Sequence, residues 1–553
     1  MDAKQDLFKE ELSHDEDKGT FATVTSELDA VAVLDVDSLA PHKYPEISTM
    51  RSIALVALVM TSSLMQVASG IGGSITIADI GADLRIPSGQ LQWVASSGSL
   101  ATACCLLLSG KICDMYGHKP VFSIGSAIGG AMFLGMGLAQ NKIQLFIFRA
   151  LAGVAYSGVT PAAIGLIGTT FAEGPIKSRA FAGLGAGAPV GTAVGLVLAG
   201  VTTQYTSAGW RTFFYICAGM SFTLSLANLF VAPGSCIPRT KYPRALRDLD
   251  WIGVVLSGGG IFCVLFPLGE GGTAPEGWKT PYIPATLASG FVLLGLFLMW
   301  EYYIEKKGTK PPLMKLSIWR RPMFPSLMAA VVCLGGSFGA AVVWMSLYWR
   351  SYEERPVIQA TLRFLPLCVV GVFANIVGSF CVAYVSGQVL LLIAAAATGI
   401  AALLFATCPA GLIYWAMQFP ACCVLVWGAD FMFLTCMLFI SSTSKPDEQG
   451  QGGSIFSAVN QIAGVLVLAL TTIVSDRVAE KESAKLGVDI IASKTASSAI
   501  PKPALLKGYQ GAFYMVVGFC VLGGLVVGIM LRKMGNVGKK KAVSTVESTS
   551  ASA

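Results

Sequence analysis

The chain has 553 residues, of which 54% are hydrophobic and 13% are charged, and its formal net charge is +7. Soluble domains carry about 25% charged residues, so this composition excludes an ordinary soluble protein and predicts a membrane protein. Its three histidines, His14, His42 and His118, exclude a histidine-rich metal centre, and its fourteen cysteines form no C-x-x-C pair. The positive charge indicates membrane orientation and no nucleic-acid partner.

Both ends of the chain are polar. Residues 1–50 are rich in Asp and Glu and lack the basic start and short apolar core of a signal peptide. We expect a disordered cytoplasmic tail there and a second one at residues 534–553.

Between the tails, the sequence predicts an all-α polytopic membrane protein with fourteen spans. A helix needs about 20 apolar residues to cross about 30 Å of hydrocarbon. Fourteen such runs centre near residues 65, 101, 130, 156, 190, 220, 259, 292, 336, 373, 397, 425, 463 and 520. The weakest are the seventh, which is rich in Gly, and the tenth, which begins with Arg363 and Pro366.

Basic residues concentrate in alternate loops, which predicts the orientation of the chain. The basic loops and the C-terminal tail hold Lys111, Lys119, Lys177, Arg179, Arg239, Lys241, Arg244, Arg247, Lys306, Lys307, Lys310, Lys315, Arg320, Arg321, Arg532, Lys533 and Lys539 to Lys541. The other short loops are nearly free of Lys and Arg, and the loop at about 476–507 is longer and mixed in sign. The even-numbered loops and both termini are therefore predicted to be cytoplasmic.

The loop between the second and third runs, "GKICDMYGHKP", concentrates charge within an apolar region. Asp114 lies where the N-terminus of a neighbouring helix or a basic side chain could bind it. Such a cluster could lock two helices together on one side of the membrane. The other interpretation is a positive-inside anchor with an incidental Asp.

This loop resembles the G-x-x-x-D-R-x-G-R-K loop of the major facilitator superfamily. Gly110, Asp114, Gly117 and Lys119 match, and His118 takes a basic position. In that family the loop is a gate. Met115 replaces the usual Arg, so the gate is expected to be weaker or differently connected here.

In the fourth run, "FRALAGVAYSG" resembles the family's R-x-x-x-G pattern, with Arg149 and Gly153. The resemblance implies a role for Arg149 in proton coupling. An Arg within a spanning helix is costly and usually faces a cavity or a partner. The alternative is a structural ion pair inside the bundle.

In the fifth run, "VGTAVGLVLAG" resembles the family's antiporter motif G-x-x-x-G-P-x-x-G-G. Gly191, Gly195 and Gly200 match, whereas Leu196 replaces the Pro and Ala199 a Gly. Glycines four residues apart also serve plain helix packing. The motif is therefore weakened evidence for efflux.

Further resemblances are "QLQWVASSGSL", "GWRTFFYI" and residues 428–454. With fourteen spans, they indicate the fungal branch of fourteen-span drug:proton antiporters and its aminotriazole-resistance subgroup, over residues 50–535. This implies the major facilitator fold: a bundle of six helices at 51–232, two inserted helices at 233–320 and a second six-helix bundle at 321–533.

Asp430 lies in the middle of the twelfth run, with no Lys or Arg within ten residues. An acidic residue in hydrocarbon is by default a functional-site hypothesis. Burial favours its neutral form, so it could exchange a proton near neutral pH. The alternative is a structural Asp that is hydrogen-bonded to a neighbouring helix.

Substrate contacts are expected near the midplane, between the two bundles. The candidates are Gln66, Trp344, Tyr348, Trp415, Gln418, Asn460 and Gln461. Trp344 and Tyr348 are one turn apart, and aromatic residues near a helix end are also typical of interfacial anchors. The first run lacks the Asp that many drug antiporters carry, which argues against a cationic drug.

The sequence thus predicts proton-coupled export of a small amphiphilic drug or secondary metabolite by alternating access. It has no G-x-x-x-x-G-K-[ST] motif, so we expect a proton gradient and no cofactor. The expected partners are a small-molecule substrate, protons and the bilayer, and we expect a monomer. The plasma membrane is favoured, although a vacuolar membrane would give the same loop charges. The alternatives are proton-coupled uptake and a non-transporting sensor; the few histidines and the lack of a nucleophile motif argue against an enzyme.

Overall fold

The computed structural model describes residues 47–86, 92–172, 174–234, 249–270, 277–308, 312–444, 448–486, 501–532 and 534–536. Almost all of the two predicted tails lies outside these residues. So do several of the predicted cytoplasmic basic residues: Arg239, Lys241, Arg244, Arg247, Lys310, Lys533 and Lys539 to Lys541.

Fourteen helices in the described part of the chain are long and apolar enough to cross a membrane. They are α3 (Thr49–Ile75), α5 (Gln92–Tyr116), α6 (His118–Leu138), α7 (Lys142–Thr170), α8 (Pro175–Tyr205), α9 (Trp210–Val231), α10 (Trp251–Glu270), α11 (Tyr282–Lys307), α12 (Phe324–Leu347), α13 (Val357–Tyr384), α14 (Gly387–Ala406), α15 (Tyr414–Thr443), α16 (Gln449–Lys485) and α17 (Lys502–Met530). Each predicted centre lies inside one of them, so the prediction of fourteen spans is confirmed, including the weak seventh and tenth. Helices satisfy their backbone groups internally, as hydrocarbon demands.

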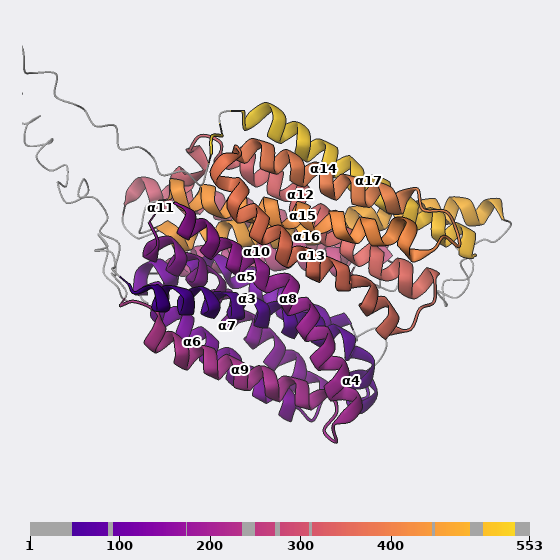
Figure 1. The fold of residues 1–553 in the computed structure, drawn as a ribbon, viewed down its shortest axis with the longest axis horizontal. Coiled ribbons are helices and arrows are strands. Elements are labelled where there is room, and N and C mark those ends of the chain that lie inside the picture. Colours follow the sequence, from indigo (N-terminus) through magenta and orange to yellow (C-terminus); the bar gives the residue numbers. More distant parts are fainter. Residues whose placement is uncertain are drawn as a thin grey trace, which may run out of the picture. The chain divides into compact units, whose positions relative to one another are not determined.

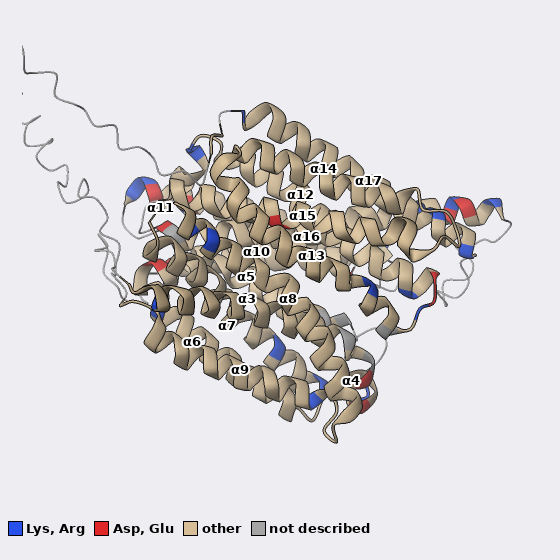
Figure 2. Ribbon diagram, in the orientation of Figure 1, with Lys and Arg blue, Asp and Glu red and all other residues tan. Residues whose placement is uncertain are grey.

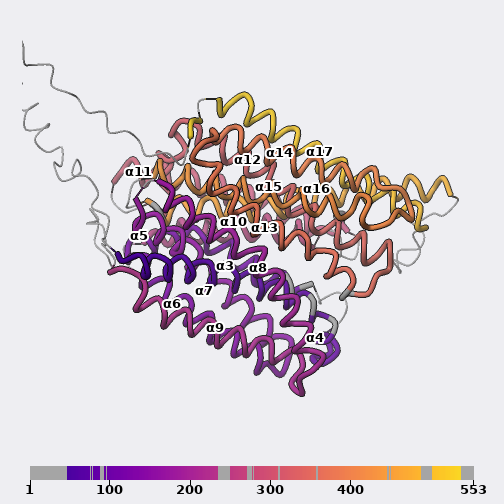
Figure 3. Tube along the Cα trace, in the orientation of Figure 1, coloured from indigo at the N-terminus to yellow at the C-terminus, as the bar shows by residue number. Residues whose placement is uncertain are grey.

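Two groups of helices form separate bundles. In the first, α3 packs along α8, while α7 packs against both α5 and α6. In the second, α14 packs against α15 and α17, while α12 packs against α16 and α17. Figure 1 shows the first bundle in indigo to magenta and the second in orange to yellow, and the trace in Figure 3 follows the same division. The bundles meet along two seams, α5 with α16 and α8 with α13.

The inserted helices α10 and α11 pack against each other beside one of these seams. α10 contacts both α5 and α16, and its Ile261 and Leu265 form a small apolar cluster with Ala103 of α5. α11 exposes large apolar side chains, including Phe291 and Met299. This outward apolar surface suits hydrocarbon contact.

Charged residues gather near the two ends of the helices, and the middle of the molecule is almost free of them (Figure 2). We call the end where α3 begins and α17 ends the terminus face, and the other end the opposite face. At the opposite face α16 runs on to Lys485, so the loop predicted at 476–507 is partly helical. Ion pairs three residues apart, Arg477–Glu480 and Lys485–Glu482, support this exposed extension.

The antiporter-like glycines bring α8 close to α3. A Cβ added at Gly191 would lie 2.5 Å from the Leu64 carbonyl oxygen, and one at Gly195 would lie 2.7 Å from the Ala68 carbonyl oxygen. At Gly200 a Cβ would meet no atom within 4 Å. Two of the three glycines in the motif are thus required by packing.

We therefore expect Gly191→Ala to destabilise the protein by about 1 to 3 kcal/mol, because the backbone of α3 must move to make room. Thermal unfolding of the purified protein would measure this as a lower Tm. Gly200→Ala, in the same helix and motif, is the matched control and should leave the Tm unchanged or raise it. Equal effects of the two substitutions would contradict the packing role.

Candidate functional site

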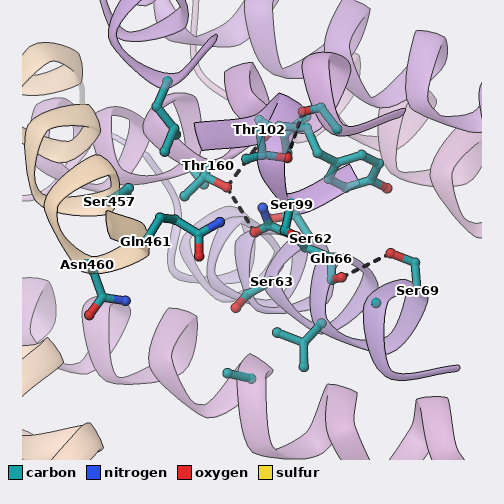
Figure 4. Close-up of a pocket in the computed structure, with 18 of the residues that line it drawn as sticks. Ser62, Ser63, Gln66, Ser69, Ser99, Thr102, Thr160, Ser457, Asn460 and Gln461 are labelled. Carbon is teal, nitrogen blue, oxygen red and sulfur yellow. Dashed lines mark hydrogen bonds between the residues drawn. The ribbon is translucent and has the colours of Figure 1, made fainter. Parts of the chain in front are cut away.

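A cavity of about 560 Å³ lies between the two bundles. Its walls come from α3, α5, α6, α7 and α8 on one side and from α12, α15 and α16 on the other. Hydroxyl and amide groups from both sides face it, as Figure 4 shows for Ser62, Ser63, Gln66, Ser69, Ser99, Thr102, Thr160, Ser457, Asn460 and Gln461. Four phenylalanines, Phe133, Phe338, Phe433 and Phe456, complete a wall that suits an amphiphilic ligand.

Three of the predicted substrate contacts, Gln66, Asn460 and Gln461, line this cavity. The Gln66 Oε1 accepts a hydrogen bond from the Thr160 hydroxyl at 3.0 Å, which joins α3 to α7 (Figure 4). The buried Asn460 Oδ1 has no hydrogen-bond partner in the described part of the structure. It is therefore available to a ligand.

The other predicted contacts lie elsewhere. Trp344 is buried and donates to the Thr471 hydroxyl at 2.9 Å, inside the second bundle. Tyr348 is also buried and packs edge-on against Phe405. Both are therefore core residues and not the interfacial anchors that we considered.

Gln418 and Trp415 are also outside the cavity. The Gln418 amide donates to Glu353 at 2.8 Å and accepts from Trp349 at 2.6 Å, so its polar atoms are satisfied within the second bundle. The side chain of Trp415 is 67% exposed. Helix position alone could not distinguish these inward and outward faces.

Asp430 and Arg149 are the charged residues among the described residues that line the cavity. Asp430 is 7% exposed and Arg149 is 6% exposed. The Asp430 Oδ2 and the Arg149 Nε each lack a hydrogen-bond partner in the described structure. Buried charged groups are costly unless they are paired, so a ligand bound at either atom, or a proton on Asp430, would lower this cost.

The surroundings of each charged residue are largely fixed by packing. The guanidinium of Arg149 lies against Gly73 of α3, where a Cβ would collide with it. None of the ion pairs among the described residues includes Arg149. Asp430 lies beside Asn375 of α13, whose amide N–H donates to the Gly371 carbonyl oxygen of its own helix at 3.0 Å.

The last turns of α5 join the bundles at the terminus face, because Gly110 and Asp114 of the predicted loop lie within this helix and only Gly117 separates it from α6. The Asp114 carboxylate accepts hydrogen bonds from the backbone N–H groups of Gly450, at 2.8 Å, and Gln451, at 2.9 Å. These are among the first N–H groups of α16, where the helix dipole favours an anion. A neighbouring helix N-terminus therefore binds Asp114, one of the two kinds of partner that its position suggested.

The two glycines of this predicted loop have different roles. Gly110 packs directly against Ser454 of α16, with no room for a side chain. Gly117 adopts a φ of +91°, which favours glycine and allows the turn from α5 into α6. Met115 is buried.

The basic residues of the loop do not all join the bundles. Lys119 donates to the Ala232 carbonyl oxygen at 2.8 Å, just beyond the end of α9 in its own bundle. His118 is buried against Gly165 of α7, also in its own bundle. Asp114 and Gly110 thus contact the second bundle, whereas the side chains of Lys119 and His118 contact their own bundle.

Glu448 is a residue at this contact that the sequence reasoning missed. It directly precedes α16, is 4% exposed, and forms ion pairs with Lys315, at 2.7 Å, and with Arg321. Burial by itself raises the pKa of Glu448, but the hydrogen bonds from Lys315 and Arg321 outweigh burial and hold it below its usual value. The available signal was an acidic residue directly before the glycine-rich start of a helix, in the stretch "EQGQGGS".

Two helical bundles around a central cavity, closed at one face by a contact between the bundles, define a membrane transport protein. A family model described as Major Facilitator Superfamily matches residues 55–468, and the chain belongs to this family. It is therefore a multi-pass membrane transporter and not an enzyme.

Its relatives are named as transporters and resistance proteins. MFS-type transporter 1 of Pyricularia oryzae is 28% identical, covering 91% of this chain and 87% of that protein. The efflux pump terJ of Aspergillus terreus is 27% identical, covering 85% and 86%. Two Saccharomyces cerevisiae proteins are also similar: a low affinity ammonium transporter, 26% identical over 84% and 86%, and the aminotriazole resistance protein, 23% identical over 80% and 76%. These relatives include the aminotriazole resistance protein, whose subgroup the sequence motifs indicated.

Solved structures show the same fold. The proton:xylose symporter XylE aligns with a TM-score of 0.58 and 12% identity, covering 87% of this chain and 95% of that chain. At this identity the likeness concerns the fold alone.

Proposed function

We propose that this transporter exports a small amphiphilic drug or secondary metabolite in exchange for protons, as a monomer in a fungal plasma membrane with both termini in the cytoplasm. The basic residues at the terminus face support this orientation. The names of terJ and of the aminotriazole resistance protein support export of a toxic or secondary compound. The energy source is the proton gradient, and no cofactor is needed.

The observation that carries the proposal is Asp430 in the wall of the cavity. Its Oδ2 and the Oδ1 of its neighbour Asn375 are both buried acceptors without a donor in the described structure. An ionised carboxylate only accepts hydrogen bonds, whereas a protonated carboxyl also donates one. A single proton on Asp430 would supply the donor that this pair lacks, which makes Asp430 the natural proton carrier.

The closed contact at the terminus face supplies the other half of the mechanism. With Asp114 bound to α16, the bundles are held together on the proposed cytoplasmic side. A proton would reach Asp430 from the opposite face, and the bundles would then reopen at the terminus face. The proton would leave there and the substrate would enter, so proton and substrate move in opposite directions.

Uptake is the second candidate, because the antiporter-like motif of α8 is weakened, with Leu196 in place of the Pro. The low affinity ammonium transporter, 26% identical to this chain, provides a second kind of probe. In uptake the proton and the substrate would occupy the cavity together. The same Asp430 would serve both directions of transport, so the cavity by itself does not favour one.

Flux in sealed vesicles of each orientation separates the two candidates. Radiolabelled aminotriazole and methylammonium are the probes, with an imposed pH gradient of either sign. Export predicts accumulation in inside-out vesicles whose lumen is acidic, and uptake predicts accumulation in right-side-out vesicles in an acidic medium. If the flux of the probes is the same with a pH gradient of either sign as with none, proton coupling is contradicted.

A further inference from the structure

The segment that follows the inserted helices, residues 312–321, lies between α11 and α16. Two carboxylates of α11 bind its backbone. Glu301 Oε1 accepts from the Leu313 N–H at 3.2 Å, and Glu305 accepts from the N–H groups of Leu316, at 3.0 Å, and Ser317, at 3.2 Å. α11 therefore determines where this segment lies.

The same segment binds the start of α16 on its other side. The Gln451 side-chain amide donates to the Leu313 carbonyl oxygen at 2.5 Å, and Lys315 pairs with Glu448 at 2.7 Å. The backbone N–H of Gln451 is one of the two that bind Asp114. A continuous path of hydrogen bonds thus leads from Asp114 of α5, through Gln451 and Leu313, to Glu301 of α11.

The inserted helices are themselves firmly joined at this end. The Trp300 indole N–H of α11 donates to both carboxylate oxygens of Asp250, at 2.9 and 3.0 Å, just before α10. Glu301 is fully buried and lies close to Gly253 of α10. Because α10 also contacts α5 and α16, the pair rests on the seam that must open when the bundles separate.

We propose that the inserted helices are a latch for the closed state, with Glu301 and Gln451 as positioning residues that hold segment 312–321 against α16. The latch keeps the α16 N-terminus where Asp114 can bind it. This inference relies on the alternating-access part of the proposed function. It assigns a role to α10 and α11, which belong to neither six-helix bundle.

Cys113 is a native reporter of this contact. Its side chain is fully buried, and a Cβ added at Gly450 of α16 would lie 3.0 Å from the Cys113 Cβ. Opening the terminus face would expose it. The experiment measures the rate at which a membrane-impermeant maleimide labels Cys113 in the full chain in nanodiscs, with mass spectrometry to locate the label and Cys113→Ala to show its background.

Gln451→Met removes the amide donor at nearly constant size, and Glu301→Met and Glu305→Met remove the acceptors on α11. Loss of one such hydrogen bond should raise the labelling rate by about fivefold. The double variant Gln451→Met with Glu301→Met should label no more than about twice as fast as either single variant, because both interrupt one path. Glu305 is only partly buried, so its variant remains informative if Glu301→Met does not fold.

The matched controls are Gln388→Met and Glu482→Met. Gln388 donates to backbone carbonyl oxygens of α17 within the second bundle, and Glu482 pairs with Lys485 at the far end of α16. Both should label at the wild-type rate. Faster labelling in Gln451→Met with wild-type rates in both α11 variants would overturn the latch. Because labelling needs neither substrate nor a pH gradient, this result is independent of proton coupling.

Discussion

The Asp430→Asn protein is expected to lose transport driven by a pH gradient while it keeps exchange of labelled for unlabelled substrate at equal pH. Asn has nearly the same size but cannot bind or release a proton, so the cavity would remain while the coupling is lost. Gradient-driven accumulation should fall by about tenfold or more. Paired measurements of gradient-driven flux and exchange in the same vesicles would show this split.

Asp476→Asn is the matched control, because Asp476 is exposed near the opposite-face end of α16 and does not line the cavity. It should leave both activities near the wild-type level. Full gradient-driven transport by Asp430→Asn would remove Asp430 as the proton carrier. A parallel loss of exchange and of gradient-driven transport would instead assign Asp430 to substrate binding or structure.

Asp114→Asn should weaken the closed contact at the terminus face. Hydrogen bonds to a charged acceptor contribute more than neutral ones, and Asn also loses the attraction to the start of α16. We expect a cost of about 2 kcal/mol, which is about thirtyfold in the equilibrium between closed and open states. Amide hydrogen exchange of Gly450 and Gln451, whose N–H groups bind Asp114, should accelerate to a similar degree.

Exchange of α14 amides is the internal control, since this helix lies within the second bundle and should be unaffected. Asp79→Asn, in the short helix α4 (Ile77–Asp83), controls for the loss of one negative charge. Unchanged protection of Gly450 and Gln451 in Asp114→Asn would return the loop to the role of a positive-inside anchor.

The sequence determined the local features of this protein. Hydrophobic length is a property of each run by itself, so the fourteen spans were predictable, including the glycine-rich seventh. The charge of Asp114 and its place near a helix end limited its partner to a helix N-terminus or a basic side chain, and the structure decided for the helix N-terminus. The family motifs added the division into two bundles, which neither length nor hydropathy specifies.

The tertiary structure decided which side chains share a space. Asn460 and Gln461 line the cavity. Trp344 and Gln418 were equally plausible substrate contacts from the sequence, but their polar atoms form hydrogen bonds inside the second bundle. Their helices are apolar almost all round, so periodicity could not show which face turns inward. Likewise Gly191 and Gly200 look alike in the motif, yet only the first meets another helix. The position of segment 312–321 between α11 and α16 depends on contacts between residues more than a hundred positions apart, which only the folded chain brings together.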